Sequence, residues 1–119
     1  MPNSDSIVIA IPTYRRPEQL AELLESLLPQ VLPAHVQVVI GDNDCGADAA
    51  EVVSRFRERG LAIAYVPVPE PGISQVRNSL VREATRACPG WRLLVMLDDD
   101  GTVLPGWFDA LVQGAKRYD

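Results

Sequence analysis

Several features that define other classes of protein are scarce or missing in this sequence of 119 residues. Its two cysteines, Cys45 and Cys88, form neither a CxxC pair nor a disulfide framework, so a reducing, cytoplasmic setting is expected. No apolar run approaches the roughly 18 residues that span a bilayer, and the polar start from Met1 to Ser6 is unlike a signal peptide. No basic stripe offsets the net charge of -5, which argues against nucleic-acid binding.

What the sequence does contain is enough apolar material for one folded domain. Apolar residues make up 47% of the chain and are spread along its length, which favours a packed core over disorder. Because no repeat, low-complexity tract or linker interrupts it, residues 1–119 are predicted to form a single domain. The acidic balance means that an anionic ligand would need a positive partner, and a divalent cation is the obvious source.

The hydrophobic pattern predicts an α/β domain. Short apolar runs at residues 7–12, 36–40, 61–66 and 93–97 are typical of strands, and the first and last are expected to be buried. A helical pattern follows each run; the first helix is expected to stop at Pro29, and Gly41 to begin the turn after the second strand. Ile73 is expected on the apolar face of the third helix. Strand and helix alternating four times imply about four parallel strands joined by right-handed crossovers.

Ligands of such sheets bind at the carboxyl ends of the strands, near the point where strand order reverses. Polar or rigid segments occupy these ends: Pro12-Thr13-Tyr14, Asp42-Asn43-Asp44, Pro67 to Gly72, and Asp98-Asp99-Asp100. The sequence therefore predicts a functional site made from these four segments.

The acidic tract Asp98-Asp99-Asp100 is the sharpest signal. Three adjacent carboxylates repel one another, so a purely structural use is disfavoured, although an acidic turn or a helix cap is the alternative. In an extended backbone Asp98 and Asp100 point the same way and Asp99 points oppositely. Two oxygen ligands on one side suit a hard cation such as Mg²⁺ or Mn²⁺.

Candidates from the first two strand ends are less specific. Asp42 is placed to bond a ribose hydroxyl or a base edge, or else only forms a turn. Tyr14 is suited to stack on a base or to line its pocket. Arg15 and Arg16 lie just before a helix N-terminus, where anions gather, but both also fit as solvated surface charges.

The helix that follows the proline-rich connection adds two candidates. Arg77 is suited to neutralise a diphosphate. Asn78 is suited to hydrogen-bond Asp98 or Asp100 and so orient that carboxylate without binding the ligand itself. By spacing alone, both are ordinary residues of a helix surface. The single histidine, His35, precedes the second strand at the opposite end of the sheet, and no catalytic role is expected for it.

Four segments taken together resemble the N-terminal half of a family 2 glycosyltransferase with the GT-A fold. They are residues 9–14, 38–43, 72–78 and 95–100, in the family's order and approximate spacing. The resemblance implies a Rossmann-like nucleotide-binding half that binds a nucleotide diphosphate sugar, with UDP favoured, through a divalent metal, Mn²⁺ or Mg²⁺.

The resemblance also implies roles for individual residues. Pro12, Thr13 and Tyr14 would border the nucleotide pocket, and Asp42 would contact the base. Asp98 would lie at the ribose side and help to hold the metal, Asp99 would belong to the donor site, and Asp100 would bind the metal as the last residue of a DXD motif. Arg77 and Asn78 match the family's Arg-Asn pair near the donor.

The family's acceptor-binding half has no counterpart in this chain. That half carries the general base of the inverting enzymes, and residues 101–119 suffice for only one helix, so no catalytic residue is nominated. The chain is therefore expected to be truncated, to bind donor weakly and to turn over little or nothing alone. The acceptor, whether sugar, lipid or protein, is left open. An uncovered sheet edge also allows pairing with a second copy, so a homo-oligomer is one expectation.

Two other readings compete with this resemblance. Residues 97–103 reproduce the first motif of haloacid-dehalogenase-like phosphatases, in which Asp98 would be the nucleophile, Asp100 the acid/base and Mg²⁺ the cofactor. That motif normally closes a first strand, whereas here it follows the fourth. A receiver-like regulatory domain needs an acidic pair after its first strand, where this chain has Pro12-Thr13-Tyr14.

Overall fold

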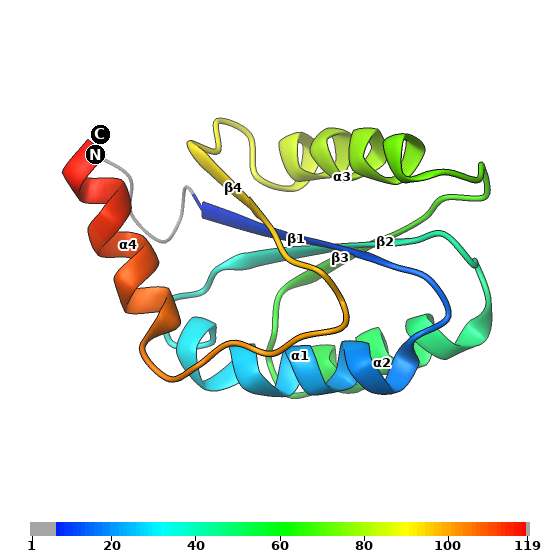
Figure 1. Cartoon of the computed structure of the whole chain (residues 1–119), viewed down its shortest axis with the longest axis horizontal. Coiled ribbons are helices and arrows are strands. Elements are labelled where there is room, and N and C mark those ends of the chain that lie inside the picture. Colours follow the sequence, from blue (N-terminus) through cyan, green and yellow to red (C-terminus); the bar gives the residue numbers. More distant parts are fainter. Residues whose placement is uncertain (1–6, 119) are drawn as a thin grey trace.

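A computed structural model describes residues 7–118, which form four strands and four helices in strict alternation (Figure 1). The elements are β1 (Ile7–Thr13), α1 (Pro17–Val31), β2 (Gln37–Asp42), α2 (Ala47–Glu58), β3 (Ile63–Pro67), α3 (Ile73–Ala87), β4 (Leu93–Met96) and α4 (Trp107–Tyr118). The α/β class and the number of strands predicted from the hydrophobic pattern are confirmed.

All four strands are parallel and lie in the order β3-β2-β1-β4. The chain adds β2 and β3 on one side of β1 and then crosses back to place β4 on the other side. Strand order therefore reverses between β1 and β4, which is the position where open α/β sheets bind their ligands. Thr13 pairs with Asp42, and Asp42 pairs with Pro67, so the carboxyl ends of β1, β2 and β3 are level with one another.

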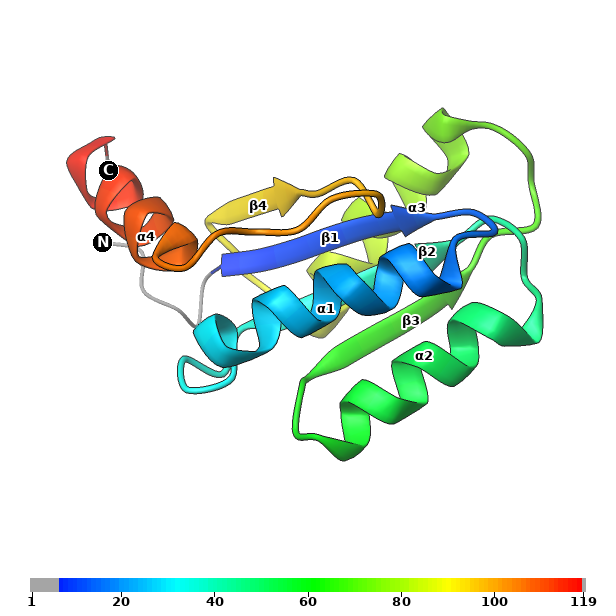
Figure 2. The same ribbon diagram turned by 60° about the horizontal axis from the view of Figure 1, so that its bottom comes forward.

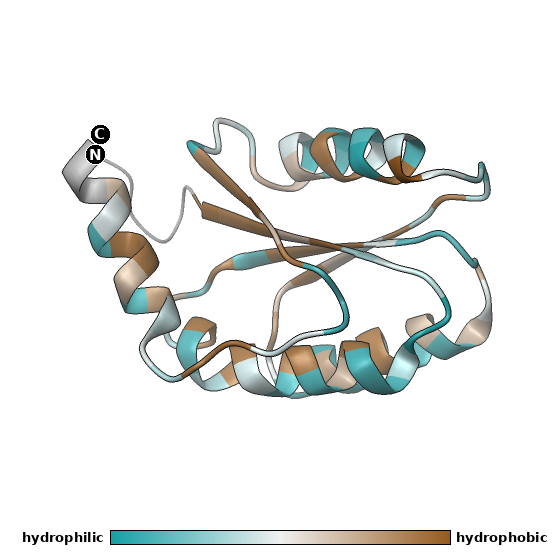
Figure 3. Ribbon diagram, in the orientation of Figure 1, coloured by the Kyte–Doolittle hydropathy of each residue, from teal (hydrophilic) through white to brown (hydrophobic). Residues whose placement is uncertain are grey.

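Helices cover both faces of the sheet. Helices α1 and α2 lie side by side on one face, α3 lies on the other, and α4 packs near the end of α1 (Figures 1 and 2). Residues of β1 alternate between the two cores: Ile7, Ile9 and Ile11 face α1 and α2, whereas Val8 and Ala10 face α3. Apolar colour accordingly follows the strands and the helix sides that face them (Figure 3).

Three local expectations are wrong. Helix α1 continues through Pro29 to Val31, because a proline this late costs one bond in the last turn and Val31 is fully buried. Strand β2 continues through Gly41 to Asp42, because β1 and β3 bond it on both sides. Ile73 is 56% exposed at the start of α3, outside the apolar face that Val76 leads.

The fourth strand also differs from its prediction. Its apolar run suggested a buried strand, yet β4 lies at the edge of the sheet with only β1 beside it. Leu93, Leu94 and Val95 are half-buried, and Met96 is 37% exposed. The side chains of β4 are apolar on both faces of the sheet, but only one edge of the strand pairs with another strand within residues 7–118. The self-pairing expected at such an edge stays a prediction.

Candidate functional site

A cleft of about 400 Å³ opens at the carboxyl ends of β1 and β4, where strand order reverses. The β1–α1 loop forms one wall, the residues after β4 form another, and the first turn of α3 closes the side. Its lining consists of Pro12, Thr13, Tyr14, Arg16, Asn43, Ile73, Val76, Asp98, Asp99 and Asp100. The structure thus brings together residues 12–14 and 98–100, and of the other two segments that the sequence singled out only Asn43 reaches the cleft.

The three aspartates behave differently. Asp98 and Asp100 are exposed, whereas Asp99 is buried at 6% exposure. This matches the expected alternation, although Asp99 and Asp100 lie in a turn and not in extended strand. Asp98 and Asp100 are therefore accessible from the cleft, and Asp99 is directed into the protein.

Asp99 is bonded by three donors from the end of β1 and the β1–α1 loop. The Thr13 hydroxyl donates to its Oδ2 at 2.8 Å, and the Tyr14 backbone N–H approaches the same oxygen at 3.4 Å. The Arg16 guanidinium donates to Oδ1 at 3.3 Å. The charge of this buried carboxylate is thus met by one cation and two hydrogen bonds, as a buried charge requires. Asp99 joins the first strand's loop to the fourth strand's end.

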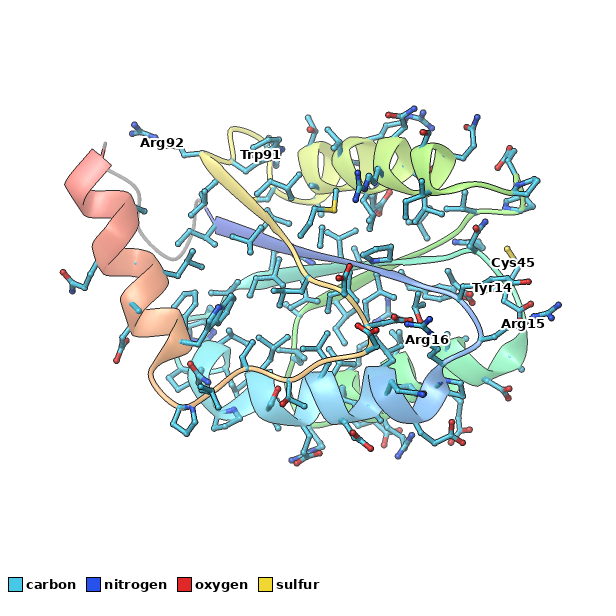
Figure 4. The ribbon with its side chains drawn as sticks, viewed as in Figure 1. Tyr14, Arg15, Arg16, Cys45, Trp91 and Arg92 are labelled. Carbon is cyan, nitrogen blue, oxygen red and sulfur yellow. The ribbon has the colours of Figure 1, made fainter. Side chains whose placement is uncertain are left out.

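Two consecutive arginines have different partners. Arg15 adopts a positive φ of 55°, which few residues other than glycine adopt, and its guanidinium pairs with Asp44 at 2.9 Å. Arg16 turns to the acidic tract, where its Nη1 lies 3.3 Å from both Asp99 and Asp100. Tyr14, Arg15 and Arg16 all lie at the carboxyl end of the sheet (Figure 4). Tyr14 is 50% exposed, with the Arg15 guanidinium 5.0 Å from its ring centroid.

Asp42 lies outside the 400 Å³ cleft. It is 1% exposed and lines a neighbouring cavity of about 280 Å³ together with Arg15, Arg16 and Asp44. Its carboxylate accepts the backbone N–H groups of Asp44 and Cys45 at 3.0 and 3.2 Å, as a turn-forming aspartate does.

The other carboxylate oxygen of Asp42 accepts the Tyr65 hydroxyl at 2.5 Å. Burial raises the pKa of Tyr65 well above its usual range, and the hydrogen bond to Asp42 raises it further. Tyr65 thus stays a neutral donor and holds Asp42 in one orientation.

Asn43, next to Asp42, does line the cleft. Its amide nitrogen donates to the carbonyl oxygens of Val68 and Glu70 at 2.8 and 2.9 Å. The proline-rich connection after β3 is thereby tied to the end of β2. Because its Nδ2 is used in this way, Asn43 has only its amide oxygen left to offer a ligand.

Arg77 and Asn78 lie on α3 with exposed side chains. Neither belongs to the described lining of the cleft, which Ile73 and Val76 reach from the same helix. Their assignment to the donor site stays a prediction. His35 precedes β2, at the opposite end of the sheet from the cleft.

The sequence pattern assigns no specific role in the site to Arg16, Asn43 or Tyr65. It indicates that Arg16 is either an anion-binding or a surface residue, and that Asn43 belongs to one of the four strand-end segments. Tyr65 is a typical strand residue, and no local pattern reveals that its hydroxyl reaches Asp42. The signal available for Arg16 is its place three residues after a strand end, directly before a helix.

Comparisons with known proteins agree with this geometry. The model of glycosyl transferase family 2 matches residues 8–119. The succinoglycan biosynthesis protein ExoM of Rhizobium meliloti (strain 1021) is 38% identical over 120 residues, which cover 98% of this chain and 37% of that protein. The uncharacterized glycosyltransferase YwdF of Bacillus subtilis (strain 168) is 29% identical over 95% of this chain and 39% of its own length. The chain thus spans less than two fifths of these curated relatives.

Solved structures show the same fold. S. aureus TarS superposes with a TM-score of 0.74 at 19% identity, over 91% of this chain and 31% of that one. The mannosyltransferase PcManGT from Pyrobaculum calidifontis, solved in complex with GDP-Man and Mn²⁺, gives a TM-score of 0.66 at 24% identity, over 80% of this chain and 27% of that one. Among residues 7–118, no helix has the length and apolar character needed to cross a membrane.

Proposed function

This chain belongs to glycosyltransferase family 2, and from that premise we propose that it is the nucleotide-sugar-binding half of an enzyme that transfers a sugar from a nucleotide diphosphate donor to an acceptor. The observation that carries the proposal is the cleft at the switch point of the sheet. It joins Pro12, Thr13 and Tyr14 to the acidic residues 98–100, and so places an aromatic ring and two exposed carboxylates in the lining of one cleft. A nucleotide diphosphate sugar carries a flat base at one end and a diphosphate between its ribose and its sugar.

The aromatic wall of the cleft suits the base. Half of the Tyr14 surface is exposed, and base–aromatic stacking contributes about 1–3 kcal/mol. Pro12 and Thr13 line the same cleft, and Asp42 lines the adjacent cavity. We assign the ribose side to Asp98, with Arg77 and Asn78 near the donor on α3. UDP is the nucleotide we favour, and GDP is the alternative to compare because the neighbour PcManGT was solved with GDP-Man.

The acidic end of the cleft suits a divalent metal, Mn²⁺ or Mg²⁺. No group of three or more His, Cys, Asp and Glu side chains within residues 7–118 is arranged to hold a metal by itself. Asp98 and Asp100 are exposed in the cleft, whereas the carboxylate of Asp99 is taken by Thr13, Tyr14 and Arg16. Two carboxylates with open positions left for phosphate oxygens and water are what such a cation needs when it binds together with a substrate.

The chain's own residues then position the donor. Asp99 keeps the β1–α1 loop, and with it Tyr14, against the end of β4. Asn43 holds the connection after β3 in place through Val68 and Glu70. When bound, the metal would stabilise the negative charge of the leaving diphosphate. A general base for the acceptor hydroxyl is assigned to sequence outside residues 1–119, so this domain alone binds donor but transfers little or none of it.

Calorimetry tests this function. UDP is titrated into the 119-residue chain with Mn²⁺ and again with EDTA, and then into Asp100→Ala and Asp98→Ala. We expect saturable binding that requires Mn²⁺ and is lost in Asp100→Ala. Glu22→Ala is the matched control, since Glu22 is an exposed acidic residue on α1 away from the cleft lining. If neither UDP nor GDP binds to the unaltered chain with Mn²⁺, the proposal is wrong.

The phosphatase interpretation of residues 97–103 has no comparable support. In this fold the motif follows the edge strand β4 and not the first strand. A colorimetric phosphate assay with Mg²⁺ and a small phosphomonoester separates the two functions, and we expect no phosphate release.

A further inference from the structure

A single arginine connects the buried and the exposed carboxylates of the acidic tract. Nη1 of Arg16 lies 3.3 Å from Oδ1 of Asp99 and 3.3 Å from Oδ2 of Asp100. Among the described residues that line the cleft, Arg16 is the one with a positive charge. Three adjacent carboxylates repel one another, and this guanidinium offsets part of that repulsion.

The two ion pairs of Arg16 differ in strength. The Asp99 side chain is 9% exposed and is also bonded to Thr13 and Tyr14, so it keeps its position when a cation binds beside Asp100. The Asp100 side chain is 57% exposed, and Arg16 itself is 47% exposed. An exposed pair of this length contributes little, about 1 kcal/mol at most. The pair with Asp100 is therefore the one that a competing cation would break.

We propose that Arg16 competes with a divalent cation for the position beside Asp100, and that cation binding releases the guanidinium to bind the donor's diphosphate. This inference rests on the proposed function. The residue then has two effects of opposite sign: it competes with the metal and it assists the nucleotide.

Electrostatics dictates both effects. A divalent cation at Asp100 repels the guanidinium at short range, whereas the pair with Asp99 keeps Arg16 at the cleft. The released N–H groups form a planar set of donors that matches phosphate oxygens. Metal and nucleotide binding are thereby coupled through one side chain, and each strengthens the other.

The test compares Arg16→Gln with the unaltered 119-residue chain. Free Mn²⁺ is first measured by electron paramagnetic resonance as Mn²⁺ alone is titrated into each protein. We expect Arg16→Gln to bind Mn²⁺ roughly two- to five-fold more tightly, the range that loss of an exposed ion pair produces. UDP is then titrated by calorimetry at saturating Mn²⁺, and here the same variant should bind roughly tenfold more weakly.

Two variants separate this role from a general effect of charge. Arg15→Gln removes the same charge one position earlier, but that guanidinium pairs with Asp44 and not with the acidic tract. It should leave Mn²⁺ affinity unchanged. Arg16→Lys keeps the charge without the planar donors, so Mn²⁺ affinity should stay close to that of the unaltered chain while UDP affinity falls. Equal thermal unfolding midpoints confirm that all three variants are folded.

Each result has one meaning. Equal or weaker Mn²⁺ binding by Arg16→Gln overturns the inference, and if UDP binding still needs Mn²⁺ and Asp100, the proposed function stands. Tighter Mn²⁺ binding without a loss of UDP affinity also overturns it, because the released arginine then does nothing for the donor. If neither protein binds Mn²⁺ nor UDP, the proposed function itself has failed and the inference fails with it.

Discussion

The hydroxyl of Thr13 donates a 2.8 Å hydrogen bond to the carboxylate of Asp99, a residue 86 positions later in the chain. Both residues are buried, at 4% and 6% exposure. The paired residues of β1 and β4 end at Ala10 and Met96, so this bond lies beyond the end of the strand pairing. It continues the contact between the two segments to the rim of the cleft, beyond the last paired residues of β1 and β4.

Removing this hydroxyl should destabilise the protein. Thr13→Val preserves shape but leaves a buried carboxylate short of its closest donor, and a hydrogen bond to a charged group contributes about 1.5–3 kcal/mol. Urea denaturation followed by circular dichroism measures the loss. Thr102→Val is the control because Thr102 is exposed, and its effect should stay within about 0.5 kcal/mol. Similar losses in both variants would mean that the Thr13 bond contributes no special stability.

Replacing Tyr14 should weaken nucleotide binding without affecting stability. Tyr14→Ala removes a ring that is 50% exposed in the cleft, so UDP affinity with Mn²⁺ should fall by about 1–3 kcal/mol. Tyr14→Phe keeps the ring and should bind UDP nearly as well. Calorimetry with both variants provides the test. Equal affinity of Tyr14→Ala and the unaltered chain would place the base elsewhere, with the cavity beside Asp42 as the next location to examine.

Two glycines should respond to alanine in opposite directions. A Cβ added at Gly41 of β2 would lie 3.2 Å from Leu80 and Val76 of α3, whereas one added at Gly114 of α4 meets nothing within 4 Å. Gly41→Ala should therefore destabilise the protein by about 1–3 kcal/mol through overpacking. Gly114→Ala should stabilise it by up to about 1 kcal/mol, since alanine favours helix. Thermal unfolding of both variants checks the pair, and a stabilising Gly41→Ala would show that α3 moves away freely.

The bond between Tyr65 and Asp42 should give stability that depends on pH. The pKa of Tyr65 is raised in the folded protein, chiefly by burial and then by its bond to Asp42. A raised pKa means that this contribution is complete below the unfolded value of about 10 and declines as pH rises above it. Tyr65→Phe should thus cost about 1–2 kcal/mol at pH 8 and less at pH 10.5.

Urea denaturation of both proteins at the two pH values measures this difference. Subtracting the values of Tyr65→Phe cancels the titration of every other group. Tyr14→Phe is the control, because it removes a hydroxyl from an exposed tyrosine and should leave the pH dependence of the unaltered chain in place. A cost for Tyr65→Phe that is the same at pH 8 and pH 10.5 would contradict the link to Tyr65 ionisation.

The order of elements could be predicted because each element has its own local hydrophobic pattern. Runs such as residues 7–12 and the stripe of α1 each bury their own apolar side chains, so period and length identify them. The edge position of β4 could not be predicted in this way. The apolar run 93–97 is the same whether one or two strands lie beside it, and only the assembled sheet shows which.

The segments of the site could be predicted, but not the partners of their side chains. Strand ends follow from the order of elements, and this places residues 12–14 and 98–100 together. The direction of each arginine depends on the left-handed backbone at Arg15, which sends Arg15 to Asp44 and leaves Arg16 facing the acidic tract. A loop conformation of this kind depends on contacts with distant residues, and no local pattern encodes it.

The reversal of strand order between β1 and β4 has a consequence for how the protein is made. A nascent chain emerging from the ribosome can pair β1, β2 and β3 early, yet the pocket acquires its acidic wall only when residues 98–100 have been synthesised. Among the strands within residues 7–118, β4 is the shortest and has a single neighbour, so it is the strand most readily detached. A form in which β4 has come away would keep most of its helix and sheet and yet lack a site. Metal-dependent nucleotide binding would therefore report complete folding more faithfully than any spectroscopic measure of secondary structure.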